Sequence, residues 1–285
     1  MSKKKKEGRR LKSLHPMDML MPFFMPDRNG SINHFKDSFD MTEAEKYILA
    51  KRKEGLSNFG FVHLLLSAYI RTVATRPGIN RFIRGQRLYA RNDITVCMTV
   101  KKELSLNAQE SLVKVHFSPE MTPEQVYNTF NEAVNAAKSE DGNEFDSVTK
   151  IFRFIPRFLL RFTFRLLKFL DYYGLVPKSL VEISPFHGSV YITSLGSLGI
   201  PPVYHHLYDF GNVPIFIAYG KKKIDYTLDD EGNVIQRKHV DFTISCDDRI
   251  CDGHYYASAF KTIKKYFKDP FLLDTPPEEI VEDIK

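Results

Sequence analysis

The chain has 285 residues and 43% apolar content, which is enough for a hydrophobic core in one large domain or two small ones. Its net charge of +6 equals the balance of residues 1–12, seven Lys/Arg against Glu7, so the rest holds 34 basic and 34 acidic residues. A nucleic-acid reader usually carries its basic patch on the folded body, so this distribution argues against a nucleic-acid partner. Three widely spaced cysteines give neither a disulfide framework nor a metal-ligand pattern and favour a reducing compartment.

The N-terminal segment does not have the pattern of a targeting signal. We expect residues 1–15 to form a basic disordered tail and residues 16–285 one domain, with no lipoyl or subunit-binding domain. The stretch LHPMDMLMPFFMP is too short and too broken by Pro and Asp for a signal peptide. No window has the length of uncharged apolar sequence that a membrane-spanning helix needs. The sequence therefore predicts a cytoplasmic protein.

The first third predicts a mixture of helices and strands. Residues 13–30, with three prolines and D-R-N-G, are expected to be irregular. Residues 32–40 predict a short strand, whose candidate inward positions are Ile32, His34 and Phe39. Thr42 and Glu45 predict a capping box for a helix that ends at Gly55. A more apolar helix is expected over Ser57–Arg76, before Pro77.

The middle of the chain predicts further strands and one capped helix. Q-R-L-Y-A and I-T-V-C-M-T-V flank R-N-D and predict a β-hairpin, and Ser111–Phe117 alternates as another strand. Thr122, Pro123 and Gln125 predict the start of a helix that runs to about Lys138, before an acidic loop.

The segment Lys150–Tyr173 contains a basic stripe, and almost all of its remaining residues are Phe, Leu or Ile. The stripe contains Arg153, Arg157, Arg161, Arg165 and Lys168. One interpretation is a helix buried on most sides by contacts between copies of the chain, with the arginines at the rim. The other is a helix lying on a membrane surface. We favour burial, because interfacial helices normally have a wider polar face.

The last third predicts a sheet and a closing helix. G-S-V-Y-I-T-S-L-G-S-L-G indicates a strand entering a glycine-rich turn, without a nucleotide-binding fingerprint. V-P-I-F-I-A-Y-G indicates a buried strand, and Lys223–Leu228 and Val234–Ser245 a hairpin across D-D-E-G-N. In Asp241–Lys265 we expect a half-buried strand, a tight polar turn ended by Gly253, and an amphipathic helix. The inward positions are Val240, Phe242, Ile244 and Cys246 on the strand and Tyr256, Ala259, Phe260 and Ile263 on the helix.

The same stretch carries a family resemblance. S-C-D-D-R-I-C-D-G-H, preceded by Y-I-T-S-L-G and P-I-F-I-A-Y-G-K, resembles the acyltransferase superfamily of chloramphenicol acetyltransferase. This fold also forms the catalytic core of 2-oxo acid dehydrogenase complexes. N-H-F and R-P-G-I-N-R-F agree in order, so the resemblance covers roughly residues 20–270. It implies an α+β fold, a two-layer sandwich of a mixed β-sheet with helices packed on it, that forms trimers.

The resemblance also implies a chemistry and its partners. The family transfers an acyl group from acyl-CoA as co-substrate, with no bound cofactor and no metal, in a channel between subunits of a homotrimer. A histidine four residues before the Asp of D-G is the general base, and a hydroxyl stabilises the tetrahedral oxyanion. That hydroxyl falls on Thr193, with Ser194 adjacent, and the structural Asp falls on Asp252. The acyl acceptor, and whether trimers assemble into a larger particle, stay open.

The base position, however, holds Asp248. A thiol near pKa ~8.5 differs from a histidine near ~6.5 by about two units, but from an ordinary Asp near ~3.9 by between four and five. The extra gap is on the order of 3–4 kcal/mol of proton-transfer driving force. Burial would raise the pKa of this carboxyl, and Arg249, if it points inward, would lower it. His254 and His206 are further substrate or channel candidates, whereas Cys246 and Cys251 are expected to pack.

Two functions are therefore open. One is a free-standing CoA-dependent acyltransferase, with Asp248 or a displaced histidine as base. The other is a non-catalytic trimeric scaffold or binding protein that keeps the fold. Membrane-surface contact through residues 150–173 and the basic tail is a third, less favoured hypothesis.

Overall fold

The computed structural model describes residues 7–101, 110–138 and 154–285. Its strands are β1 Gly8–Arg10, β2 Ile32–Asp40, β3 Arg81–Arg84, β4 Arg87–Arg91, β5 Ile94–Lys101, β6 Glu110–Phe117, β7 Val190–Ser194, β8 Ile215–Leu228 and β9 Val234–Asp247. Its helices are α1 Pro16–Phe24, α2 Thr42–Lys53, α3 Phe61–Thr75, α4 Pro123–Lys138, α6 Arg157–Tyr173, α7 Lys178–Ile183 and α8 Gly253–Lys268. The predicted α+β class is confirmed.

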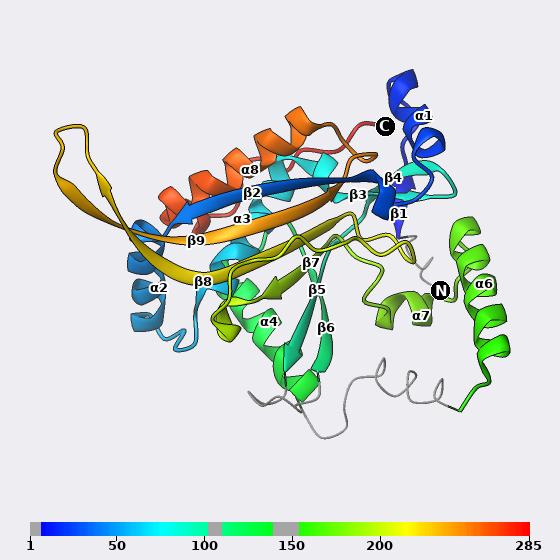
Figure 1. Ribbon diagram of the computed structural model, residues 1–285, viewed down its shortest axis with the longest axis horizontal. Helices are drawn as coiled ribbons and strands as arrows, with labels where there is room; N and C mark the ends of the chain where they lie inside the picture. The colour runs from blue at the N-terminus through cyan, green and yellow to red at the C-terminus, as the bar shows by residue number, and fades with distance from the viewer. Residues whose placement is uncertain (1–6, 102–109, 139–153) are drawn as a thin grey trace.

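A six-stranded mixed sheet forms one layer, in the order β2-β9-β8-β7-β5-β6. β7 runs parallel to both of its neighbours, β8 and β5, and the other pairs are antiparallel. Helices α2, α3, α4 and α8 cover one face of this sheet (Figure 1). The two-layer sandwich predicted from the resemblance is therefore confirmed.

The core lies between that face and the helices. Alternation along β9 places Val240, Phe242, Ile244 and Cys246 inward, and all four are buried, as predicted. Helix α3 runs through the middle and is buried from His63 to Ala74. Helix α8 adds its predicted apolar side through Tyr256, Ala259 and Ile263, with Phe260 half-buried beside them.

The R-N-D hairpin prediction is wrong. Strand β4 pairs with β3 and β1 in a small separate sheet, whereas β5 pairs with β6 and β7 in the large one. The hairpin that exists joins β3 to β4 through Gly85 and Gln86, which have φ of 55° and 56°. A two-residue turn of this kind needs positive φ at both positions, and glutamine there gives a weak sequence signal.

Two predictions near the N-terminus also fail. Residues 13–30 are not irregular, because Pro16 begins helix α1, where its fixed φ suits the first turn. His34 is exposed, because it alternates with Phe35 and Phe39, which face the core. The strand itself is confirmed.

Of the two helix starts predicted from a capping box, one has that box. Thr122 donates its N–H to Gln125 Oε1 at 2.9 Å, as expected of a capping box. At α2 the Thr42 N–H instead donates to Asp40 Oδ1 at 2.8 Å, because Glu45 is drawn to Lys222 and Lys238.

Two further local predictions are corrected by the backbone. Helix α3 begins at Phe61 rather than at residue 57, because the Gly60 N–H donates to His63 Nδ1 at 3.0 Å. The turn does not require glycine at position 253, because a Cβ there would meet nothing within 4 Å and the φ of Gly253 is not positive.

Candidate active site

The turn between β9 and α8 holds Asp248 in a fixed position. Its backbone N–H donates to the Ser31 carbonyl at 2.9 Å, and its Oδ1 accepts a hydrogen bond from Asn33 Nδ2 at 2.6 Å. Asn33 belongs to the N-H-F motif, which the sequence singled out without giving this residue a role. The half-buried carboxyl is therefore tied to the neighbouring strand β2.

A buried ion pair makes the turn rigid. Asp247 is only 1% exposed and accepts two hydrogen bonds from Arg249, Nε to Oδ1 at 2.8 Å and Nη2 to Oδ2 at 2.9 Å. Arg249 Nη1 also donates to the Met25 carbonyl at 2.9 Å, and Arg28 Nε lies 3.4 Å from Asp247 Oδ2. The guanidinium of Arg249 is thus committed to Asp247 and to the segment after α1.

This arrangement decides the direction of the Asp248 pKa. Burial raises the pKa of the Asp248 carboxyl, and the negative charges of Asp247 and Asp252 add to the rise. The hydrogen bond from Asn33 opposes it. The alternative in which Arg249 lowers the pKa does not apply, because its guanidinium binds Asp247. Asp248 is therefore a stronger base than an ordinary aspartate.

Asp252 fixes the start of the helix that follows the turn. It is the N-cap of α8, and its Oδ1 accepts the Tyr255 N–H at 2.7 Å, which satisfies one free donor of the first turn. His254 follows on the exposed side of that turn. The turn thus brings Asp248, Asp252 and His254 to one end of the sheet.

His205 and His206, which follow β7 in the chain, lie away from the β9–α8 turn. Residues 201–208 run across the face of the sheet opposite the helices, where Thr243 Oγ1 donates to the Val203 carbonyl at 2.5 Å. His206 is exposed there, while His205 stacks on Phe216 with 3.8 Å between ring centroids. Burial lowers the pKa of His205, which keeps its ring neutral.

Thr193 and Ser194 end β7 and point to opposite faces of the sheet. Ser194 shares the helix-covered face with Ile192 and is hydrogen-bonded to Tyr219. Thr193 shares the opposite face with Tyr191, which belongs to a small apolar cluster there. Of the two hydroxyls, only that of Thr193 faces away from the core.

Strand register shows that one chain does not bring Thr193 to Asp248. Thr193 lies level with Ala218 on β8, which lies level with Thr243 on β9. Asp248 comes five residues after Thr243, directly beyond the end of β9. At about 3.3 Å per residue and about 4.8 Å per strand, the two Cα atoms are roughly 19 Å apart. Their side chains cannot act on one carbonyl within one chain.

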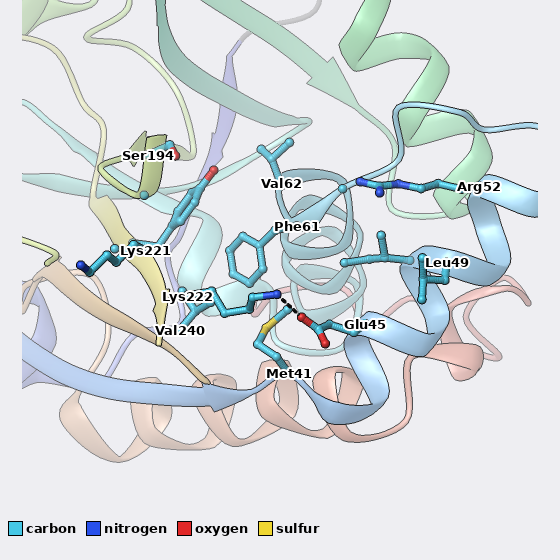
Figure 2. Close-up of a pocket in the computed structure, with 15 residues that line it drawn as sticks. Met41, Glu45, Leu49, Arg52, Phe61, Val62, Ser194, Lys221, Lys222 and Val240 are labelled. Carbon is cyan, nitrogen blue, oxygen red and sulfur yellow. Dashed lines mark hydrogen bonds and ion pairs between the residues drawn. The ribbon is translucent and has the colours of Figure 1, made fainter. Parts of the chain in front are cut away.

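Ser194 instead lines a cavity of about 660 Å³ at the opposite end of the sheet (Figure 2). Its walls come from α2, the start of α3 and strands β7 to β9, and are mostly apolar. Figure 2 shows the ion pair between Lys222 and Glu45 on one side and Arg52 on another. Neither Asp248 nor Thr193 lines it, so it is separate from the turn.

The three thiols are buried enough to favour their protonated forms. Burial raises the pKa of Cys97 to about 11 and that of Cys251 to about 12, and raises that of Cys246 well above its ordinary value. A protonated thiol is a poor nucleophile, so packing is their role, as expected. Within residues 7–101, 110–138 and 154–285, no three His, Cys, Asp or Glu side chains gather as metal ligands would.

Comparison with solved structures identifies the fold. The cubic core of a pyruvate dehydrogenase multienzyme complex matches with a TM-score of 0.57 and 15% identity over 92% of this chain and 93% of that one. Azotobacter vinelandii dihydrolipoamide acetyltransferase, studied for the role of a serine, a histidine and an asparagine in its catalytic mechanism, matches with a TM-score of 0.54 and 16% identity over 92% and 93%. A chloramphenicol acetyltransferase matches with a TM-score of 0.52 and 15% identity over 88% and 94%.

The sequence comparisons are negative. No protein-family model matches the chain, and no curated protein matches it. The chain therefore has the fold of the dehydrogenase-complex acyltransferase cores and of chloramphenicol acetyltransferase, as the sequence motifs predicted.

Proposed function

We propose that this chain transfers an acyl group from acyl-CoA to a thiol or hydroxyl acceptor, with Asp248 as general base. The observation that carries the proposal is the Asp248 carboxyl itself. It is held at the β9–α8 turn with a raised pKa, while the neighbouring guanidinium is committed elsewhere. The histidine and asparagine studied in the Azotobacter enzyme are four positions apart, and Asp248 and Asp252 have the same spacing.

The proposed reaction follows from the two groups. Asp248 takes the proton of the acceptor thiol or hydroxyl, and the freed lone pair attacks the thioester carbonyl. The tetrahedral oxyanion accepts a hydrogen bond from the hydroxyl of Thr193. When the intermediate collapses, the carbon–sulfur bond to CoA breaks and Asp248 returns the proton to the leaving thiolate. The acylated acceptor and free CoA are the products.

Such a site requires a second copy of the chain, because Asp248 and Thr193 are roughly 19 Å apart in one copy. A homotrimer like those that the resemblance implies would place Thr193 of one copy across from Asp248 of the next. The β8–β9 hairpin supports association, since it projects beyond the body (Figure 1) and leaves Tyr226, Leu228 and Val234 68–70% exposed. Free thiols at all three cysteines agree with a cytoplasmic location.

The second candidate is a non-catalytic trimeric scaffold. It is favoured by the short hydrogen bond from Asn33 to Asp248, because such a bond stabilises the carboxylate and weakens it as a base. In that case Asp248 would fasten the turn to β2 and take no part in chemistry. The two functions differ in what happens when Asp248 loses its charge.

Purified protein supplied with acetyl-CoA and dihydrolipoamide, or a hydroxyl acceptor, tests the two candidates through release of the CoA thiol. The acyltransferase proposal expects turnover that falls at least about 100-fold in Asp248→Asn, the usual scale for loss of a general base. Asp269→Asn, at an exposed carboxylate that follows the C-terminal end of α8, is the matched control and keeps full activity. If the protein shows neither turnover nor CoA binding by calorimetry, the scaffold is the remaining candidate.

A further inference from the structure

Helix α6 presents three lengthwise stripes of different chemistry. A basic stripe recurs at Arg157, Arg161, Arg165 and Lys168, and none of the four forms an ion pair with a residue that the structure describes. An aromatic stripe beside it contains Phe158, Phe162, Phe169 and Tyr173. A third stripe contains Leu160, Leu167 and Asp171. The helix therefore has two exposed faces and one face turned toward the protein.

The aromatic stripe is open to solvent. Phe158 is 75% exposed, Phe162 63% and Phe169 56%, and no residue of α6 is buried. Burying large aromatic side chains is worth more than burying any other kind, so a row of them is rarely left exposed on an isolated domain. Such a row is typical of a surface that binds a partner.

The helix is attached to the body at its C-terminal end. Asp171 Oδ1 lies 3.1 Å from the buried His187 ring, and Tyr172 Oη donates to Gln86 Oε1 at 2.8 Å. Gln86, in the β3–β4 turn, also reaches the Pro22 carbonyl of α1 through Nε2 at 3.5 Å. Both helices thus meet at the same turn, and Figure 1 shows them at one end of the molecule.

We propose that α6 docks this protein on an anionic membrane surface, a role beyond the acyl-transfer proposal. The phenylalanines enter the headgroup and acyl boundary, and the basic stripe beside them contacts lipid phosphates. Helix α1 adds apolar side chains at the same end, with Phe23 58% and Phe24 66% exposed. In the part of the chain that the structure describes, no helix has the length and apolarity to cross a bilayer.

The stripes favour lipid over packing of α6 on α6 of a second copy. In a two-fold pair the same patch meets itself, so the basic stripes of the two copies would come together without counter-charges. An anionic lipid surface supplies those counter-charges. The sequence favoured burial of this helix because its polar face is narrow. The structure explains part of its wide apolar surface, because one apolar side of α6 faces the protein itself. Leu160 and Leu167 lie on the side of Asp171, which faces the protein. The basic stripe, the aromatic stripe and the exposed Leu159 and Leu166 remain for an outside partner.

The absence of tryptophan from the chain makes a direct test possible. Phe162→Trp places a single indole on the aromatic stripe. Phe271→Trp is the control, because Phe271 is 52% exposed and lies beside Tyr47 of α2, away from α6. With vesicles of phosphatidylglycerol and phosphatidylcholine at low salt, the Phe162→Trp emission shifts to the blue and the control emission does not. Co-sedimentation with the same vesicles weakens about 30-fold in the double variant Arg161→Gln/Arg165→Gln, from about a fivefold loss of affinity per charge.

Either of two results overturns the proposal. One is no blue shift of Phe162→Trp and no co-sedimentation with anionic vesicles. The other is a Phe162→Trp emission already blue-shifted without vesicles, together with dissociation of an oligomer in Phe162→Ser/Phe169→Ser by sedimentation velocity, which would assign the face to protein contacts. Loss of acyl transfer in Asp248→Asn bears on neither result, so the two proposals fail separately.

Discussion

Replacing Asp248 with histidine changes the basicity of the proposed catalytic group with little disturbance of the fold. The side chain is half-buried at a turn, and the buried pair of Asp247 and Arg249 that fixes this turn is untouched. An imidazole nitrogen also accepts the hydrogen bond that Asn33 now donates to the carboxylate. We therefore expect the Asp248→His protein to fold and assemble like the wild type.

The expected gain in activity is set by the difference in pKa. An ordinary aspartate and a histidine differ by about 2.6 units, or about 3.5 kcal/mol, which sets a ceiling of about 400-fold on the change in proton-transfer driving force. The raised pKa of Asp248 closes part of this gap. Only a fraction of the driving force appears in a rate, so we expect turnover to rise about 10- to 100-fold.

The assay compares CoA release from acetyl-CoA by the wild type, Asp248→His and Asp248→Asn at neutral pH, with a thiol acceptor. The order of rates should be histidine, then aspartate, then asparagine. Equal rates in all three proteins would refute the assignment of the base. Complete inactivity of the histidine variant, with its oligomer intact, would refute acyl transfer by this mechanism.

Three further predictions concern stability. Arg249→Met leaves Asp247 buried with only Arg28 at 3.4 Å, so the free energy of unfolding in urea should fall by about 3 kcal/mol; an unchanged midpoint would contradict the ion-pair account. Asp252→Ala should cost about 1 kcal/mol by loss of the α8 N-cap, while Asp252→Asn should keep the cap and most of the stability. Burial raises the pKa of Glu7, but Arg91 and Arg84 outweigh it and lower the pKa to about 2. Glu7 therefore stabilises the fold above its unfolded pKa near 4.5, and this contribution is lost as the pH falls toward 2; Glu7→Gln should flatten the dependence of thermal stability on pH across that range.

Local patterns in the sequence predict the strands and helices that alternate clearly between core and solvent. Val240 to Cys246 on β9 and Tyr256 to Ile263 on α8 repeat with the periods of a strand and a helix, so their inward faces follow directly. The division of strands between two sheets is a long-range property. Nothing near Arg87–Arg91 indicates pairing with residues 8–10, and the turn through Gln86 lacks the usual glycine at its second position.

In the candidate site, too, local motifs were predicted from the sequence, whereas contacts between distant residues were not. The motif resemblance places Asp248 and Asp252 at the β9–α8 turn, and the structure confirms that location. The orientation of Arg249 was open, because it depends on the carbonyls of Met25 and Pro26, which are distant in the sequence. The role of Asn33 was missed for the same reason, since only the β2–β9 register brings it beside Asp248.

The proposed site is shared between two copies of the chain, and mixing two inactive variants tests this most directly. Thr193→Val keeps the base and Asp248→Asn keeps the hydroxyl, so each alone should be inactive. After unfolding and reassembly together in equal amounts, each mixed trimer should hold one site that pairs an intact Asp248 with an intact Thr193 of the partner subunit, which is about a quarter of all sites. We therefore expect recovery of about a quarter of wild-type turnover. No recovery in mixed oligomers made from an active wild type would contradict it.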